Sequence, residues 1–158
     1  MSIVASLKQF AAIRASMNQP ADRALWEHSS VEAMLLAHGR LFNYQQRPLP
    51  SGIRAGKLRR CYQNSFYAAD DDETMTIYCE GFASTVGIPL NHAWVTRDGC
   101  SAIDPTWDYE AGLDDRMEYF GIPFEFDFVR RAVVRSGCYG VLQVNSRESV
   151  DVMIQWLR

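Results

Sequence analysis

Long apolar runs are absent from this sequence, and no stretch approaches the ~20 consecutive residues that a membrane-spanning helix requires. Internal repeats, low-complexity tracts and linker-like segments are absent too, so the 158 residues are predicted to form a single domain over 1–158. Basic charge is not in excess, since 16 Lys and Arg against 19 Asp and Glu leave a formal net charge of −3. The composition therefore argues against a membrane or nucleic-acid partner.

Closely spaced cysteines and histidines are also lacking. The four cysteines are Cys61, Cys79, Cys100 and Cys138. They form no CxxC pair, whereas structural zinc sites usually use such pairs. An even count would suit two disulfides in a secreted protein, but residues 1–17 contain Lys8 and Arg14 and show helical periodicity, unlike a signal peptide. We therefore expect a cytoplasmic protein with reduced thiols and no cofactor or metal.

Helical signals dominate the first part of the chain. An apolar stripe that starts at Ile3 ends before the breaker sequence Asn18-Gln19-Pro20. Ser29 and Glu32 have the spacing of a capping box, which predicts a helix with Ser29 as its N-cap. Two further helices are predicted over residues 61–69 and from Asn145 onward.

Strand signals gather later in the chain. Residues of high strand propensity and turn signals predict strands over 74–82, 92–96, 100–104 and 137–144. The segment 119–124 is ambiguous, because Gly121 and Pro123 interrupt its apolar pattern. Helices that come first and strands that come later predict an α+β fold, with N-terminal helices packed on a small antiparallel sheet.

The most informative stretch is a predicted hairpin that carries His92 on one arm and Asp104 on the other. If Gly99 occupies the left-handed position of a three-residue loop, Thr96 pairs with Cys100. His92 then lies directly opposite Asp104 on the same face, with Cβ atoms about 5 Å apart. A two-residue turn would instead place the two side chains on opposite faces. The sequence allows both registers, and the chemistry favours the first.

Cys61 lies at the predicted start of a helix, upstream of the hairpin. A thiol becomes a strong nucleophile as a thiolate, which an adjacent imidazolium and a helix N-terminus both favour. The free N–H groups of that helix end can also stabilise an oxyanion, and a carboxylate can orient the imidazole. Cys61, His92 and Asp104 are therefore the candidate catalytic residues, and Lys57, Arg59 and Arg60 add positive potential near the thiol.

Cys61 at a helix start, His92-Ala93-Trp94 on a strand and then Asp104-Pro105-Thr106-Trp107 resemble the transglutaminase-like branch of the papain-like cysteine enzymes. The resemblance covers residues 57–107 and implies a papain/transglutaminase-like fold. It implies Cys61 as nucleophile, His92 as base and Asp104 as orienting acid. The Cys61–His92 interval is short for this family, and Arg60 replaces a residue that is often smaller. Because such relatives include proteases, amidases, deamidases, transferases and inactive binding forms, the resemblance does not fix the reaction.

Three further residues are candidates for supporting the site. Asn64 follows Cys61 by one helical turn and could face the site or the solvent. Glu80 lies in the middle of a predicted strand, where a charge needs a partner. Trp94 is expected to be a core residue more than a wall of the substrate site, and the same holds for Trp107.

These observations predict a cysteine hydrolase or acyltransferase that attacks a peptide or carboxamide carbonyl through a thioester, with hydrolysis favoured over transfer. Its substrate would be a protein, a peptide or a small amide. One alternative is a catalytically inactive binding module of the same fold. Another is a metal site built from Cys61, His92 and Asp104.

Overall fold

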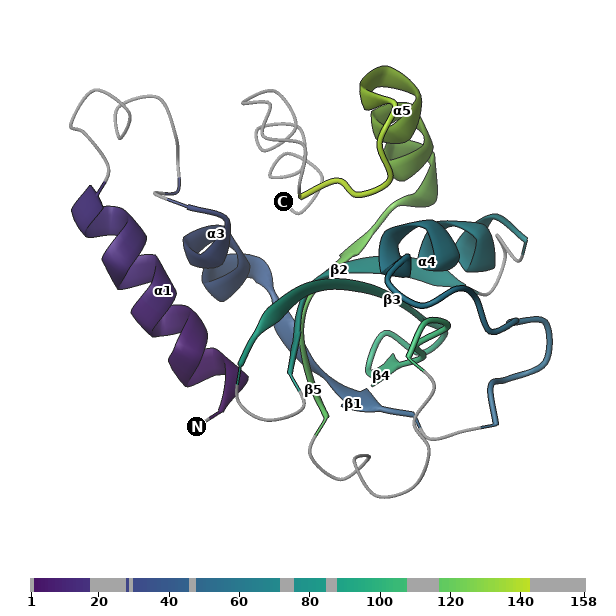
Figure 1. Cartoon of the computed structure of the whole chain (residues 1–158), viewed down its shortest axis with the longest axis horizontal. Helices are drawn as coiled ribbons and strands as arrows, with labels where there is room; N and C mark the ends of the chain where they lie inside the picture. Colours follow the sequence, from purple (N-terminus) through teal and green to yellow (C-terminus); the bar gives the residue numbers. More distant parts are fainter. Residues whose placement is uncertain are drawn as a thin grey trace.

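The computed structural model describes residues 2–17, 28, 30–45, 48–71, 76–84, 88–107 and 117–142. Its elements, in chain order, are α1 (Ile3–Met17), α3 (Val31–His38), β1 (Arg40–Tyr44), α4 (Cys61–Asp70), β2 (Ile77–Ser84), β3 (Leu90–Thr96), β4 (Ser101–Ala102), β5 (Glu118–Phe124) and α5 (Phe126–Ser136). These elements form an α+β fold, as predicted (Figure 1). Among the described helices, none has the length and apolar character to cross a membrane.

The strands form one sheet in the order β3-β2-β5-β1-β4. Val95 and Ile103 then exchange backbone hydrogen bonds of 3.0 and 2.8 Å, so the chain beyond β4 returns to the other edge strand, β3. The sheet therefore curls on itself, as Figure 1 shows. The expected purely antiparallel sheet is wrong, because β1 and β4 run parallel. The long connection through α4, β2 and β3 lets these two strands point the same way.

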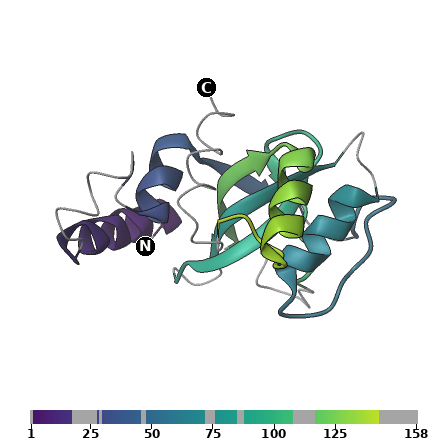
Figure 2. The ribbon, with the colours of Figure 1, turned by 90° about the horizontal axis from the view of Figure 1, so that it is seen from above.

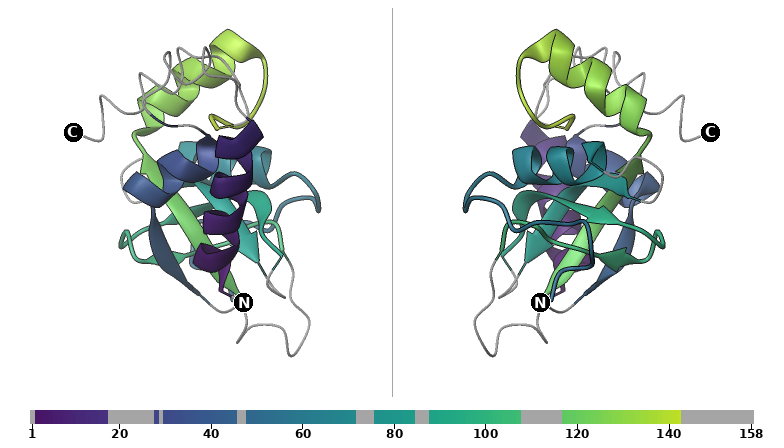
Figure 3. Two further views of the ribbon diagram at one scale, coloured as in Figure 1. Left: turned by 90° about the vertical axis from the view of Figure 1, so that its left-hand side faces the viewer. Right: turned by 90° about the vertical axis from the view of Figure 1, so that its right-hand side faces the viewer.

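The helices gather in two pairs. Helices α1 and α3 lie together at one end of the molecule, whereas α4 and α5 lie at the other (Figures 2 and 3). All four contribute to one hydrophobic cluster, through residues such as Leu7, Leu35, Ala69 and Phe128. That shared cluster joins both helix pairs to the same face of the sheet.

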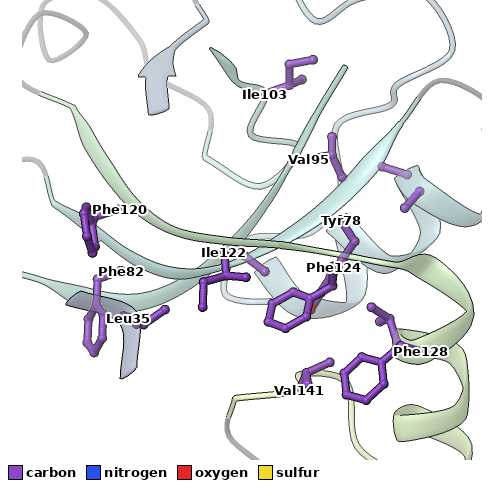
Figure 4. Packing of buried hydrophobic residues seen from close by; sticks show 14 of the residues in the cluster. Leu35, Tyr78, Phe82, Val95, Ile103, Phe120, Ile122, Phe124, Phe128 and Val141 are labelled. Carbon is purple, nitrogen blue, oxygen red and sulfur yellow. The ribbon is translucent and has the colours of Figure 1, made fainter. Parts of the chain in front are cut away.

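Side chains alternate between two cores along the strands, as the two-residue strand period requires. Val95, Ile122 and Phe124 belong to the cluster that contacts the helices (Figure 4). Trp94 and Tyr119 belong to a second cluster, which includes Phe42 and Ala102. The second cluster supports the candidate site.

A pair of glycines lets β2 and β5 approach closely. Gly81 pairs with Gly121 across the two antiparallel strands. A Cβ atom on either glycine would collide with the backbone of the opposite strand, so neither position accepts a side chain. The segment 119–124, ambiguous in sequence, is thus a central strand whose glycine serves a close backbone approach.

Several sequence predictions need correction. The N-cap of α3 is Ser30, whose Oγ accepts a hydrogen bond from the N–H of Ala33, so the capping box on Ser29 is wrong by one residue. Strand β1 and helix α5 gave no sequence signal that we recognised. The strand predicted over 137–144 is wrong within residues 137–142, because Gly137 caps α5 and no strand follows it there. The helix predicted from Asn145 lies outside the described residues.

Candidate active site

His92 and Asp104 meet where the curled sheet closes, between β3 and the chain that follows β4. His92 belongs to β3, and Asp104 directly follows the Val95–Ile103 bridge. The His92 Nε2 atom lies 2.6 Å from Oδ2 of Asp104, and both side chains are buried. The two residues therefore share a face, and the two-residue turn that would separate them does not form.

The hairpin reaches this arrangement through a different register from the predicted one. Gly99 has the expected positive φ of 72°, but Val95 pairs with Ile103. The reason is Asp98, whose carboxylate accepts hydrogen bonds from the N–H groups of Cys100 and Ser101 and widens the loop. His92 is thus diagonal to Asp104, and the two-residue shift keeps both side chains on one face.

Four groups converge on the Asp104 carboxylate. Its Oδ1 accepts hydrogen bonds from the backbone N–H groups of Thr106 and Trp107, at 2.8 and 3.2 Å. Its Oδ2 accepts a 2.8 Å hydrogen bond from the Tyr119 hydroxyl besides its contact with His92. Because every donor is fixed by backbone or by a buried phenol, the carboxylate holds the imidazole in one orientation.

Electrostatics favour an ion pair between these two buried groups. Burial alone would raise the pKa of Asp104, but the charge of His92 and the hydrogen bonds hold that pKa below its ordinary value. Burial would likewise lower the pKa of His92, yet the Asp104 charge and the hydrogen bond outweigh it and raise that pKa. The imidazole at this position is therefore a strong proton acceptor.

Cys61 lies beside the His92 imidazole, on the side away from Asp104, and completes a row of three side chains. It is half-buried at the first position of α4, and a side-chain hydrogen bond with His92 contributes to the raised pKa of the histidine. Since Nε2 of His92 contacts Asp104, its Nδ1 is the nitrogen left for the thiol. The order Cys61–His92–Asp104 allows a proton to pass from sulfur to imidazole while the carboxylate balances the resulting charge.

The start of α4 places backbone N–H groups beside the thiol. The first α-helical bond runs from the N–H of Asn64 to the carbonyl of Arg60, at 2.8 Å. The N–H groups of residues 61–63 precede that bond and cannot take part in the helical ladder. Arg60 provides no side-chain cap, and Arg59 just before it has a positive φ of 63°. This strained entry presents Cys61 and its N–H at the helix end.

Asn64 connects the loop that precedes α4 to the turn that carries Asp104. Its Nδ2 donates to the carbonyl of Lys57 at 2.8 Å and to the Thr106 hydroxyl at 2.9 Å. The N–H of Gly56 adds a 2.7 Å bond to the carbonyl of Pro105. Asn64 thus connects the helix that starts at Cys61 to the turn that carries Asp104, and its side chain does not point only to solvent.

Aromatic rings enclose the His92–Asp104 pair. Trp107 stacks on the imidazole, with ring centroids 4.1 Å apart and an interplanar angle of 24°. Trp107 is half-buried and packs against the second hydrophobic cluster, at the margin of the core. Trp94 is fully buried and packs against Tyr119, which confirms its place in the core. Tyr119 went unrecognised in sequence because only the fold brings β5 to Asp104.

Glu80 lies on the opposite face from His92 and has its own set of partners. It is fully buried and accepts hydrogen bonds from the Tyr78 hydroxyl, at 2.7 Å, and from the N–H of Leu142, at 2.9 Å. The N–H of Val141 also donates to it. Glu80 therefore anchors the segment after α5, on the face of the sheet opposite to His92.

The metal-site alternative lacks a matching ligand arrangement in the described part of the chain, where no three His, Cys, Asp or Glu side chains are placed to hold one ion. Both oxygens of Asp104 already accept hydrogen bonds.

Searches for similar protein families, characterised proteins and solved structures found no match.

Proposed function

We propose that this protein is a cysteine-nucleophile enzyme of the transglutaminase/papain-like type. It attacks a peptide or carboxamide carbonyl through a thioester, and water resolves that intermediate. The observation that carries the proposal is the buried imidazole of His92, which bonds to Asp104 on one side and to the Cys61 thiol on the other. The substrate class is a protein, a peptide or a small amide, and the reaction needs no cofactor.

The first half-reaction forms the thioester. The Cys61 sulfur attacks the carbonyl carbon while its proton passes to His92, and the carbonyl oxygen becomes an oxyanion. Backbone N–H groups at the start of α4 are suited to stabilise that oxyanion. The C–N bond then breaks, and the leaving amine takes the proton from His92. Asp104 balances the imidazolium charge throughout this step.

The second half-reaction regenerates the thiol. His92 removes a proton from water, and the resulting hydroxide attacks the thioester carbonyl. The C–S bond breaks, sulfur regains the proton, and a carboxylic acid leaves. Water is the proposed acceptor because the sequence carries no recognisable amine-acceptor site.

Selective alkylation tests the proposal without a known substrate. At about pH 6, iodoacetamide should modify Cys61 well before the other thiols, since the hydrogen-bonded imidazole of His92 can take the thiol proton as sulfur attacks. Cys100 and Cys138 are exposed and serve as internal references, whereas burial strongly raises the pKa of Cys79. Peptide mapping by mass spectrometry identifies the modified residue. If Cys61 reacts no faster than Cys100 or Cys138, the site has no activated thiol and the proposal fails.

A peptide-based electrophile then tests for carbonyl-directed chemistry. Such a probe should label Cys61 and not the exposed references, because recognition of the peptide adds to thiol reactivity. The Cys61→Ala variant should show no labelling and retain the folded state. A binding module of the same fold would instead keep partner affinity in Cys61→Ala.

A further inference from the structure

The loop that leads to Cys61 is a concentration of positive charge in a chain that is acidic overall. Between Glu32 and Asp70 the sequence has no acidic residue, although the net charge of the whole chain is −3. Arg54, Lys57 and Arg59 lie in this interval, immediately before the nucleophile, and all are exposed. The loop follows the outer edge of the molecule before it enters α4 (Figure 1).

These cations are not neutralised within the described part of the chain. Ion pairs recorded there, such as those of Arg14, His92 and Arg130, do not involve these loop residues. The Arg60 guanidinium donates to the neutral Gln63 side chain, at 3.1 Å, which leaves its charge in place. The loop therefore presents a positive field to solvent on the approach to the thiol.

The loop is also held in place, so its charges have a defined position. Ile53 is buried, and the N–H of Gly56 bonds to the carbonyl of Pro105. Asn64 holds the carbonyl of Lys57 to the helix that starts with Cys61. A flexible arm of cations would gain affinity at an ordering cost, whereas an anchored loop is preorganised for one binding direction.

We infer that the substrate is an acidic peptide, with at least one Asp or Glu side chain near the carbonyl that Cys61 attacks. This inference rests on the proposed function and specifies its substrate. Carboxylates of the peptide would contact the basic loop and place the carbonyl beside the start of α4. Such pairing is worth most where both charges are partly shielded from water, as at the edge of a site.

Two small alkylating reagents of different charge measure the field at the thiol directly. Iodoacetate and iodoacetamide transfer the same carbon to sulfur with loss of iodide, but only the first is an anion. The ratio of their rate constants at Cys61 should exceed the same ratio at exposed Cys138 by about fivefold at low salt. The difference should shrink at about 0.5 M salt, where screening acts over a few ångströms.

A matched pair of double variants tests whether the loop cations produce the positive electrostatic field at the Cys61 thiol. Lys57→Gln/Arg59→Gln should lower the Cys61 ratio about threefold. Lys8→Gln/Arg131→Gln removes the same charge from exposed positions on α1 and α5 and should leave the ratio unchanged. If the ratio at Cys61 equals that at Cys138, or does not respond to the loop variant, the inferred acidic substrate is wrong.

Two peptide electrophiles with one reactive group then test recognition, one with Glu and one with Gln beside that group. The Glu peptide should label Cys61 about fivefold faster in the wild type, and the loop variant should remove the preference. Equal labelling of the two peptides by the wild type overturns the inference. The proposed function fails separately, if Cys61 shows no excess reactivity toward neutral iodoacetamide.

Discussion

Asp104 and Glu80 are two buried carboxyl groups with closely similar hydrogen-bond donors and opposite electrostatic behaviour. Each accepts hydrogen bonds from one tyrosine hydroxyl and from two consecutive backbone N–H groups. Asp104 alone also contacts an imidazole, at 2.6 Å. The pKa of Asp104 lies below its ordinary value, whereas burial raises the pKa of Glu80 despite its three donors.

The comparison shows what a neighbouring cation adds to a carboxylate that is already hydrogen-bonded. A phenol and two N–H groups do not offset the cost of burying the charge at Glu80. At Asp104 the charge of His92 provides the difference. One carboxyl is therefore prepared to stabilise an imidazolium, and the other holds a segment of chain against the sheet.

The largest expected effect is on the labelling of Cys61, which should depend on the region around Asp104 and His92 more than on the region around Glu80. His92→Ala should reduce labelling of Cys61 by a peptide electrophile nearly as far as Cys61→Ala, because the thiol loses its base and ion-pair partner. With a cleaved amide substrate in hand, turnover by the double variant should be no lower than that of the worse single variant, since members of one catalytic unit are not additive. Labelling kinetics followed by intact-mass spectrometry provide the measurement. Wild-type turnover in Cys61→Ala would falsify the enzyme proposal.

Replacing each carboxylate by its amide sharpens the comparison. Asp104→Asn should slow Cys61 labelling about 10³-fold, because the amide can hold the imidazole in the wrong tautomer. Glu80→Gln should leave the labelling rate within about twofold but lower the free energy of unfolding by about 1–2 kcal/mol, because an amide N–H₂ then faces backbone donors. Urea denaturation of both variants provides the stability values. A large rate loss in Glu80→Gln would show that the two regions are coupled.

The two regions should also lose stability in different pH ranges. The raised pKa of Glu80 means that the folded state binds the proton more tightly, so stability relative to Glu80→Gln should fall as pH rises above 4.5. The pKa of His92 is raised to about 9, so its stabilising contribution is complete below 6.5 and is lost as pH rises through 9. Thermal melts of wild type, Glu80→Gln and His92→Gln between pH 4 and 10 test both windows. A His92 contribution that grows toward alkaline pH would contradict the ion pair.

The smallest expected effect comes from the two tyrosine hydroxyls. Tyr119→Phe removes one donor from Asp104 and should lower the labelling rate about tenfold, since a hydrogen bond to a charged group is worth ~1.5–3 kcal/mol. Tyr78→Phe removes the equivalent donor from Glu80 and should reduce stability, with a smaller effect on the labelling rate than Tyr119→Phe. Equal rates in the two variants would mean that Tyr119 does not position the acid.

Local patterns predicted most of the elements that carry the site. The helix that begins at Cys61, the strand that carries His92 and the left-handed Gly99 all follow from short-range signals. Strand β5 was ambiguous because Gly121 looks like a strand breaker in sequence. Its reason is a close approach to Gly81, which lies far away in the chain. Local propensity cannot register such a contact.

The candidate site also combines features that the sequence predicts with features that only the fold provides. The sequence by itself determined which side chains could form a Cys–His–Asp row, because their order and their hairpin are local features. The tertiary structure alone decided the register that makes His92 and Asp104 diagonal, the Tyr119 hydroxyl on the carboxylate, and the Trp107 ring on the imidazole. It also decided that Glu80 holds Leu142 and not the triad. The physical reason is that burial, hydrogen-bond partners and pKa depend on which distant segments the curled sheet brings together.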